Sequence, residues 1–109
     1  MQDKVAAQLH KILANTYAIY LKTQNYHWNV EGPNFYALHK MFEEQYTELA
    51  GAVDEIAERL RALGHKAPGS FAIFQANTEL KAGVETASWK QMVKELSEDH
   101  KALHAIVTA

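Results

Sequence analysis

The stretch that decides the fold runs from Asn25 to Gly64 and reads NYHWNVEGPNFYALHKMFEEQYTELAGAVDEIAERLRALG. It contains two apolar patterns of helical spacing, separated by the turn-forming residues Glu31 to Asn34. The pattern predicts a second helix over about Phe35 to Leu63, with Asn34 as its cap and Gly64 at its end. Because the turn is short, the two helices are expected to run antiparallel.

Both helices are expected to bury one face, because their apolar side chains recur every three or four residues. The stripe of the first helix consists of Val5, Leu9, Ile12, Leu13, Thr16, Tyr20, Thr23 and His27. The expected buried positions of the second helix are Leu38, Phe42, Leu49, Val53, Ile56 and Leu60.

After Gly64 we expect a long connection with one short helix, and then a third long helix. The apolar cluster Phe71 to Phe74 follows Ser70, which is a suitable cap for one or two helical turns. Ser88 and Gln91 fit a capping box at the start of the last helix. That helix carries the apolar residues Met92, Val93, Leu96, Leu103 and Ile106. The sequence therefore predicts an all-α helical bundle forming a single domain over residues 1–109, without strands or repeats.

Composition excludes several classes of function. The chain has 11 basic and 13 acidic residues, and it contains no run of Lys or Arg that would follow a phosphate backbone. Nucleic-acid binding therefore has no electrostatic support. It has no cysteine, so any metal must be bound by imidazole nitrogen and carboxylate oxygen, which favours iron or manganese over structural zinc. No stretch approaches the length of a membrane span or resembles a signal peptide, so the expected compartment is the cytoplasm.

Four ionisable residues share one face of the second helix. With His39 as the reference, Glu43, Asp54 and Glu58 all lie within roughly 100° of it on a helical wheel. An ionisable group among apolar neighbours is costly unless it is paired or bound to a metal. His39 and Asp54 are separated by roughly 22 Å along the axis, so a single chain cannot place both at one metal ion.

Two chains remove this difficulty. If two copies of the helix cross antiparallel about a twofold axis, residues of the two copies meet when their numbers add up to a constant. The numbers of His39 and Glu58 have the same total as those of Glu43 and Asp54. His39 then faces Glu58 of the partner subunit, and Glu43 faces Asp54 of the partner subunit. The small residues Thr47 and Ala50 flank the crossing point and allow a close approach.

His27 completes the donor set, because the short turn brings the end of the first helix beside His39. The candidate ligands are His27, His39, Glu43, Asp54 and Glu58, with Glu43 as a natural bridging carboxylate. Oxygen donors form the majority, which suits iron in both oxidation states. On spacing alone, a metal site and a hydrogen-bonded dimer interface are both compatible with these residues.

Other charged residues have simpler interpretations. The acidic face with Glu44, Glu48 and Glu55 is typical of a solvated helix surface. His100 and His104 are four residues apart but have no acidic partner at a matching register. His10 and His65 are expected at the surface.

The stretch from Asn25 to Gly64 closely resembles the Dps family, the ferritin-like DNA-binding proteins from starved cells. The resemblance rests on His-Trp-Asn at His27, on the Gly-Pro-Asn-Phe turn, on Leu-His at His39, and on Asp54 with Glu58 four residues later. By position, the histidines match the family's two histidine ligands, and Asp54 and Glu58 match its partner-chain carboxylates. Glu43 lies where the family often carries Asp.

The resemblance implies iron as the metal, oxidation of ferrous ion with hydrogen peroxide at an inter-subunit centre, and mineral storage in a shell of twelve subunits. It places Trp28 beside the centre. It also shows two departures. The chain lacks a Lys-rich tail at either end, so DNA binding is not expected. The family's fourth bundle helix is missing, which is expected to leave Trp89, Leu96 and Leu103 partly uncovered.

Two rival hypotheses remain. One is a Dps relative that protects or compacts DNA without catalysis. The other is an inactive helical dimer whose His and carboxylate groups form interface hydrogen bonds.

Overall fold

The computed structural model describes residues 2–108, with side chains from Lys4 onward, and confirms the all-α class. The helices are α1 (Gln2–Asn29), α2 (Phe35–Ala62), α3 (Phe71–Asn77) and α4 (Trp89–Val107). Three are long, and α3 is the short helix expected in the connection. The described residues contain no strand and no fourth long helix.

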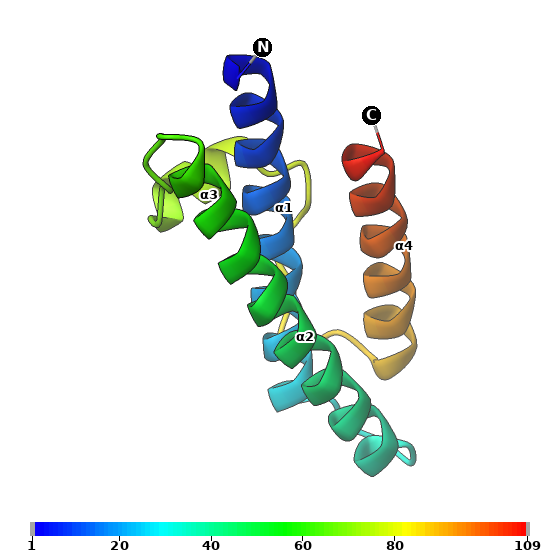
Figure 1. Cartoon of the computed structure of the whole chain (residues 1–109). Helices are drawn as coiled ribbons and strands as arrows, with labels where there is room; N and C mark the ends of the chain where they lie inside the picture. Colours follow the sequence, from blue (N-terminus) through cyan, green and yellow to red (C-terminus); the bar gives the residue numbers. More distant parts are fainter. Residues whose placement is uncertain (1, 109) are drawn as a thin grey trace.

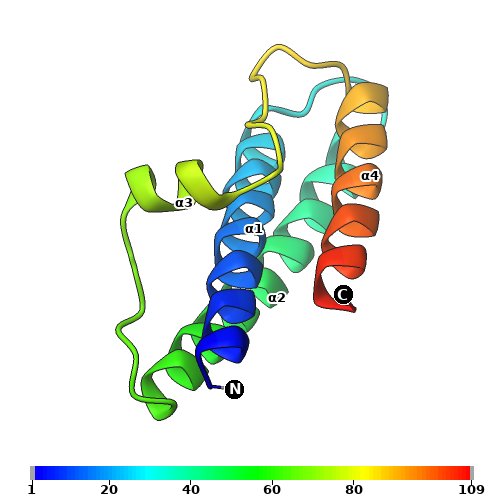
Figure 2. The same cartoon turned by 90° about the horizontal axis from the view of Figure 1, so that it is seen from above.

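α1 is the central helix of the molecule (Figure 1). α2 and α4 both run antiparallel to α1, and α3 lies across α1 in the view from above (Figure 2). α1 contacts each of the other three helices, whereas the Cα atoms of α2 and α4 stay more than 8 Å apart over nearly their whole described length. The two outer helices are therefore held together mainly through α1.

Two apolar clusters form the core. One contains Tyr26, Val30, Phe42, Met92 and Leu96 and joins α1, α2 and α4. The other contains Ala6, Leu13 and Leu60 and joins α1 to the end of α2.

The core differs from the sequence-based expectation at two positions. Val5 is 51% exposed, and Ala6 is buried in its place. Leu96 was expected to be partly uncovered but is only 4% exposed, because Tyr26 and Phe42 pack against it. Trp89 and Leu103 are half-buried, as expected.

The helix ends follow most of the expected caps. Gly64 adopts a φ of +90°, and the amides of Gly64 and His65 donate to the carbonyls of Arg61 and Leu60, which is a Schellman motif. Ser70 and Ser88 each accept a hydrogen bond from the amide three residues later. Asn34 occupies the cap position of α2, but its side chain makes no capping hydrogen bond.

The expected capping box at α4 is only half formed. Ser88 accepts from the Gln91 amide, but the Gln91 side chain donates to Glu95 rather than to the backbone of Ser88. Glu95 attracts this amide because it lies one helical turn further along the same face.

A buried polar network fixes α4 to α1. Lys22 is almost completely buried, and its Nζ lies 2.8 Å from Asp99 Oδ2 and 3.3 Å from Glu95 Oε1. The Tyr26 hydroxyl donates to Glu95 Oε1 at 2.5 Å. Burial and the hydrogen bond to Glu95 raise the pKa of Tyr26 to about 12. The sequence did not predict this network.

None of the helices between residues 2 and 108 has the length and apolar character that crossing a membrane requires.

Candidate metal centre

His27 and His39 form a stacked pair where α1 meets α2. Their ring centroids are 3.8 Å apart, and the ring planes are inclined by 18°. His27 lies in the last turn of α1 and is buried, whereas His39 lies in the second turn of α2 and is half-buried. The expectation that the short turn brings these two residues together is confirmed.

Each ring of the pair is fixed by the backbone of the other residue. His27 Nδ1 lies 2.7 Å from the His39 carbonyl oxygen, and His39 Nδ1 lies 2.7 Å from the His27 carbonyl oxygen. A carbonyl oxygen only accepts hydrogen bonds, so each Nδ1 must carry the proton. In a neutral ring, Nε2 is then left with its lone pair, which is the form that binds a metal ion.

The Nε2 atoms of both rings remain available for this purpose. Among the described side chains and backbone groups, none makes a hydrogen bond to Nε2 of either histidine. The pair therefore presents two nitrogen donors whose tautomers and orientations are set by the fold before any ligand arrives.

The turn between the helices makes this pairing possible. Gly32 adopts a φ of +112°, a conformation that favours glycine, and a Cβ atom there would lie 3.2 Å from the Trp89 ring. The backbone of the turn thus passes close beneath α4. Any residue larger than glycine would disturb both the turn and the contact with α4.

Two aromatic rings enclose the histidine pair. Phe35 stacks on His39 with 5.0 Å between centroids, and Tyr46 meets His27 edge-on at 5.2 Å. Neither residue was predicted from the sequence. Tyr46 follows His39 by seven residues and so lies on the same helix face, which was the available signal.

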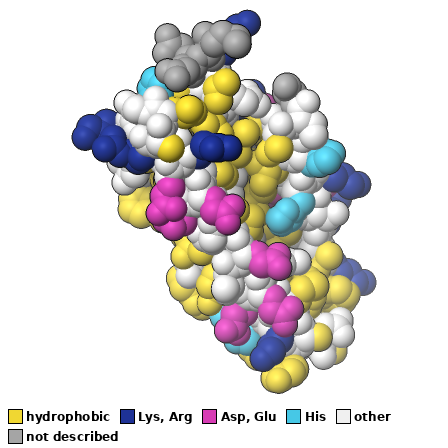
Figure 3. Space-filling view, viewed as in Figure 1, with side chains coloured by type: hydrophobic (Ala, Val, Ile, Leu, Met, Phe, Trp, Pro, Cys, Tyr) yellow, Lys and Arg dark blue, Asp and Glu magenta, His cyan; other side chains and the backbone are white. Residues whose placement is uncertain are grey.

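The carboxylates of the predicted site lie along α2 and are exposed. Glu43 is one turn beyond His39, and Asp54 and Glu58 lie further along the helix. Figure 3 shows acidic side chains spread along the length of α2, beside a strip of hydrophobic side chains between α2 and α4. Within one chain, the described residues contain no group of three or more His, Asp or Glu placed to hold a metal ion.

The structure thus brings together the two predicted histidines and does not bring Glu43, Asp54 or Glu58 to them within one subunit. Two nitrogen donors alone make a weak site for a divalent ion, and iron in particular favours added oxygen donors. A complete centre of this composition requires carboxylates from another chain.

The other histidines do not form a comparable arrangement. His100 and His104 are exposed on α4, and His10 and His65 are half-buried rather than fully at the surface. No stacked ring pair involving these four residues occurs within the described chain.

Comparison with known proteins gives the class and then the family. The sequence matches the ferritin-like domain over residues 6–108. It is 37% identical over 99 residues to the DNA protection during starvation protein of Brevibacillus brevis, covering 91% of this chain and 66% of that protein. It is 39% identical over 101 residues to general stress protein 20U of Bacillus subtilis, covering 91% of this chain and 68% of the relative.

Solved structures agree. The crystal structure of a Dps protein from Bacillus brevis superposes with a TM-score of 0.94 at 36% identity, covering 98% of this chain and 72% of that one. A Dps protein from Vibrio cholerae, described as a member of the ferritin-like diiron-carboxylate superfamily, superposes with a TM-score of 0.92 at 31% identity, over 96% of this chain and 66% of its own. The chain belongs to the Dps family of ferritin-like proteins.

This chain spans about two thirds of the length of the Brevibacillus and Vibrio proteins. It spans 54% of a low-temperature-induced relative from Nostoc, to which it is 42% identical.

Proposed function

We propose that this protein binds ferrous ion and oxidises it with hydrogen peroxide, as part of iron storage and detoxification. The observation that carries the proposal is the reciprocal hydrogen bonding of His27 and His39, which fixes the tautomer of both rings and leaves Nε2 of each without a hydrogen bond among the described residues. Iron here is a substrate that enters the site and leaves it as ferric mineral.

We infer that two subunits complete the site across a twofold axis. His27, His39 and Glu43 come from one subunit, and the oxygen donors come from Asp54 and Glu58 of the partner subunit. Asp54 and Glu58 support this division, because they are exposed on α2 and lie too far along the helix to reach the histidines of their own chain. The same operation produces two equivalent sites in each dimer.

The chemistry of this donor set matches the reaction. Neutral imidazoles bind ferrous ion, and the negative charge of three carboxylates stabilises the ferric product more than the ferrous substrate. Glu43 is the natural bridging carboxylate of this proposed set. Consuming ferrous ion and peroxide together would suppress the formation of hydroxyl radical. The family further implies assembly of the dimers into a shell of twelve subunits, which we include in the proposal.

An anaerobic titration tests the proposal. The parent chain is loaded with ferrous ion, hydrogen peroxide is added, and ferric formation is followed by absorbance. The double variant His39→Ala with Asp54→Ala is expected to lose the fast phase. The matched control is Glu44→Ala with Glu55→Ala, which removes two carboxylates from the neighbouring face of α2 and should keep the parent rate.

Equal rates in the parent and in the His39/Asp54 double variant would remove the proposed site. Light scattering provides a second check, because a chain that stays monomeric at working concentration has no complete site. A mass of twelve subunits would support the shell.

Direct DNA binding is the second candidate, since two relatives are named for DNA protection. The formal net charge of −2 gives this function no electrostatic support. Retention of DNA by the protein at low salt, weakening steeply as salt is added, would favour it over iron oxidation as the protective activity.

A further inference from the structure

A chain of aromatic rings connects the histidine pair to the far side of the α1–α2 interface. Tyr46 meets His27 with 5.2 Å between ring centroids, and Tyr20 meets Tyr46 at 6.1 Å. Tyr17 follows Tyr20 at 5.4 Å. Each of these contacts has the edge-to-face geometry of interacting aromatic rings, and all three tyrosines are half-buried.

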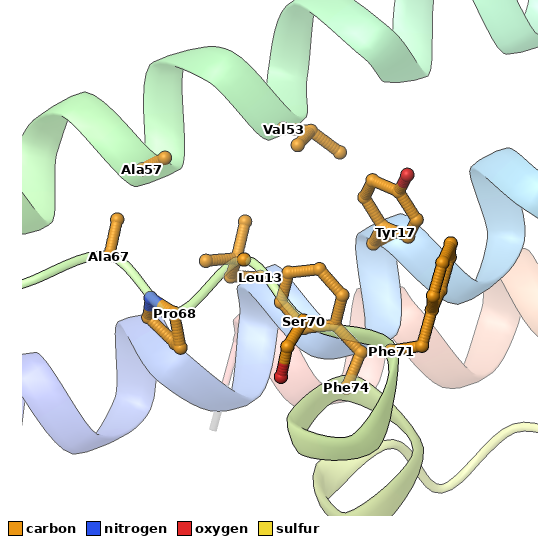
Figure 4. A pocket seen from close by; sticks show the side chains of 10 residues that line it. Leu13, Tyr17, Val53, Ala57, Ala67, Pro68, Ser70, Phe71 and Phe74 are labelled. Atoms are coloured by element: carbon orange, nitrogen blue, oxygen red, sulfur yellow. The ribbon is translucent and has the colours of Figure 1, made fainter.

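The last tyrosine of this series lies at a pocket. Tyr17 stacks on Phe74 of α3, with 4.8 Å between centroids. It lines a pocket of about 520 Å³ together with Leu13, Val53 and Phe71 (Figure 4). The series therefore begins at a candidate redox centre and ends, three ring contacts later, at a surface opening.

We propose that Tyr46, Tyr20 and Tyr17 form a one-electron relay that supplies an electron to the histidine centre and moves the resulting radical to Tyr17. This inference rests on the proposed iron oxidation. Tyrosine is among the side chains most easily oxidised by one electron, and the contacts between neighbouring rings leave no long gap for the electron to cross. Other aromatic residues of the chain, such as Tyr36, are not part of the series.

The step balances with the substrates already named. Hydrogen peroxide takes one electron from ferrous ion and one from Tyr46, and its O–O bond breaks. The phenolic proton of Tyr46 and one proton from solvent convert the two hydroxides to water, leaving ferric ion and a tyrosyl radical. A second ferrous ion then reduces the radical, which regains a proton from solvent. Two ferrous ions are thus oxidised for each peroxide, without release of a hydroxyl radical.

The relay supplies the second electron of the peroxide reduction whenever only one ferrous ion occupies the centre. It also places the reactive species away from the imidazole ligands, which are themselves oxidisable.

Freeze-quenched electron paramagnetic resonance tests the relay. The full chain is loaded with ferrous ion without oxygen and mixed with hydrogen peroxide. We expect a tyrosyl signal in the parent, together with oxidative modification or cross-linking of Tyr17 detected by peptide mass spectrometry. Tyr46→Phe should reduce both several-fold, and because one electron of the peroxide reduction is then missing, it should also slow ferrous oxidation. This variant keeps the ring, and the Tyr46 hydroxyl makes no hydrogen bond within the described structure, so the fold should be unaffected.

Tyr36→Phe is the matched control, because Tyr36 is also on α2 but is 75% exposed and lies outside the ring series. It should leave the radical signal and the Tyr17 modification unchanged. An unchanged signal in Tyr46→Phe, or a signal that depends on Tyr36 or on Trp28, would overturn the relay alone. A parent chain that oxidises no iron would overturn the proposed function and the relay together.

Discussion

His27 and His39 each use one ring nitrogen, Nδ1, for a hydrogen bond within the fold, and the proposed function assigns the other, Nε2, to a ligand. The Nδ1 atoms are hydrogen-bonded across the pair, so removing a ring has a structural consequence as well as a chemical one. Asparagine separates the two effects, because its side-chain amide can take the place of Nδ1–H but provides nothing in place of Nε2.

His39→Asn is therefore expected to unfold with a free energy within about 1 kcal/mol of the parent value. His39→Ala should lose about 1–2 kcal/mol, since the His27 carbonyl loses its partner. Both variants should lose tight ferrous binding. Urea unfolding measures the first quantity, and anaerobic calorimetry with ferrous ion measures the second. Retained ferrous binding in His39→Asn would show that Nε2 is not a ligand.

Residue types and spacing were enough to predict which histidines meet, and they gave the Ser70 and Ser88 caps. They were not enough to predict how the rings are held, because the reciprocal hydrogen bonds depend on the distance between two backbones at a turn. The Gln91 side chain was predicted to complete the capping box, but it donates its hydrogen bond to Glu95 instead.

Among the structural elements, the turn between α1 and α2 fixes the position of the histidine pair. Gly32→Ala is expected to destabilise the protein by about 1–3 kcal/mol, because alanine is strained at positive φ and its Cβ would press on Trp89. Gly51→Ala is the control. Gly51 lies inside α2, a Cβ there meets nothing within 4 Å, and the change should stabilise the helix by about 0.5–1 kcal/mol. Thermal unfolding of both variants checks the prediction, and equal effects would contradict it.

The contact between α1 and α4 should depend on pH. Burial raises the pKa of Glu95, but hydrogen bonds from Tyr26, Gln91 and Lys22 outweigh burial, so the pKa lies below its ordinary value of 4.5. As the pH falls from the ordinary pKa toward the lower folded pKa, the unfolded state binds more protons than the folded state. Stability is therefore fully present above about pH 4.5 and falls as the pH drops through the folded pKa.

Glu95→Gln should show a smaller loss of unfolding free energy between about pH 5 and pH 3 than the parent. Urea unfolding at a series of pH values measures this difference. Parallel curves for the two proteins would show that Glu95 does not contribute to the acid sensitivity.

The elements themselves were largely predictable. Long apolar periodicities gave α1, α2 and α4, and the serine caps gave the start of α3 and α4. The network around Lys22 was not predictable, because a lysine one turn before a buried tyrosine has no sequence signal until α4 is placed beside it. The burial of Ala6 in place of Val5 was not predictable for a similar reason. The position of the neighbouring helix decides which of two adjacent residues of α1 faces the core.

At the scale of the whole molecule, the arrangement around α1 explains both the stability of the bundle and the incompleteness of the site. The burial of Leu96 shows that α4 is better covered than the sequence suggested, because Tyr26 and Phe42 reach it from two helices. The proposed division of the metal ligands rests on helical geometry: residues separated by roughly 22 Å on one helix meet only when a second helix is present.

Mixing two inactive variants gives the most direct test of this division. In a dimer that pairs one His39→Ala subunit with one Asp54→Ala subunit, one site has lost both residues and the other site is intact. Random pairing makes half of the dimers mixed, so co-refolded variants should recover about a quarter of the parent's fast ferrous oxidation. The control mixture, His39→Ala with His27→Ala, has no intact site in any pairing and should stay inactive. Recovery by the first mixture alone would support a site shared between subunits, whereas failure to recover in a sample that forms mixed dimers would contradict it.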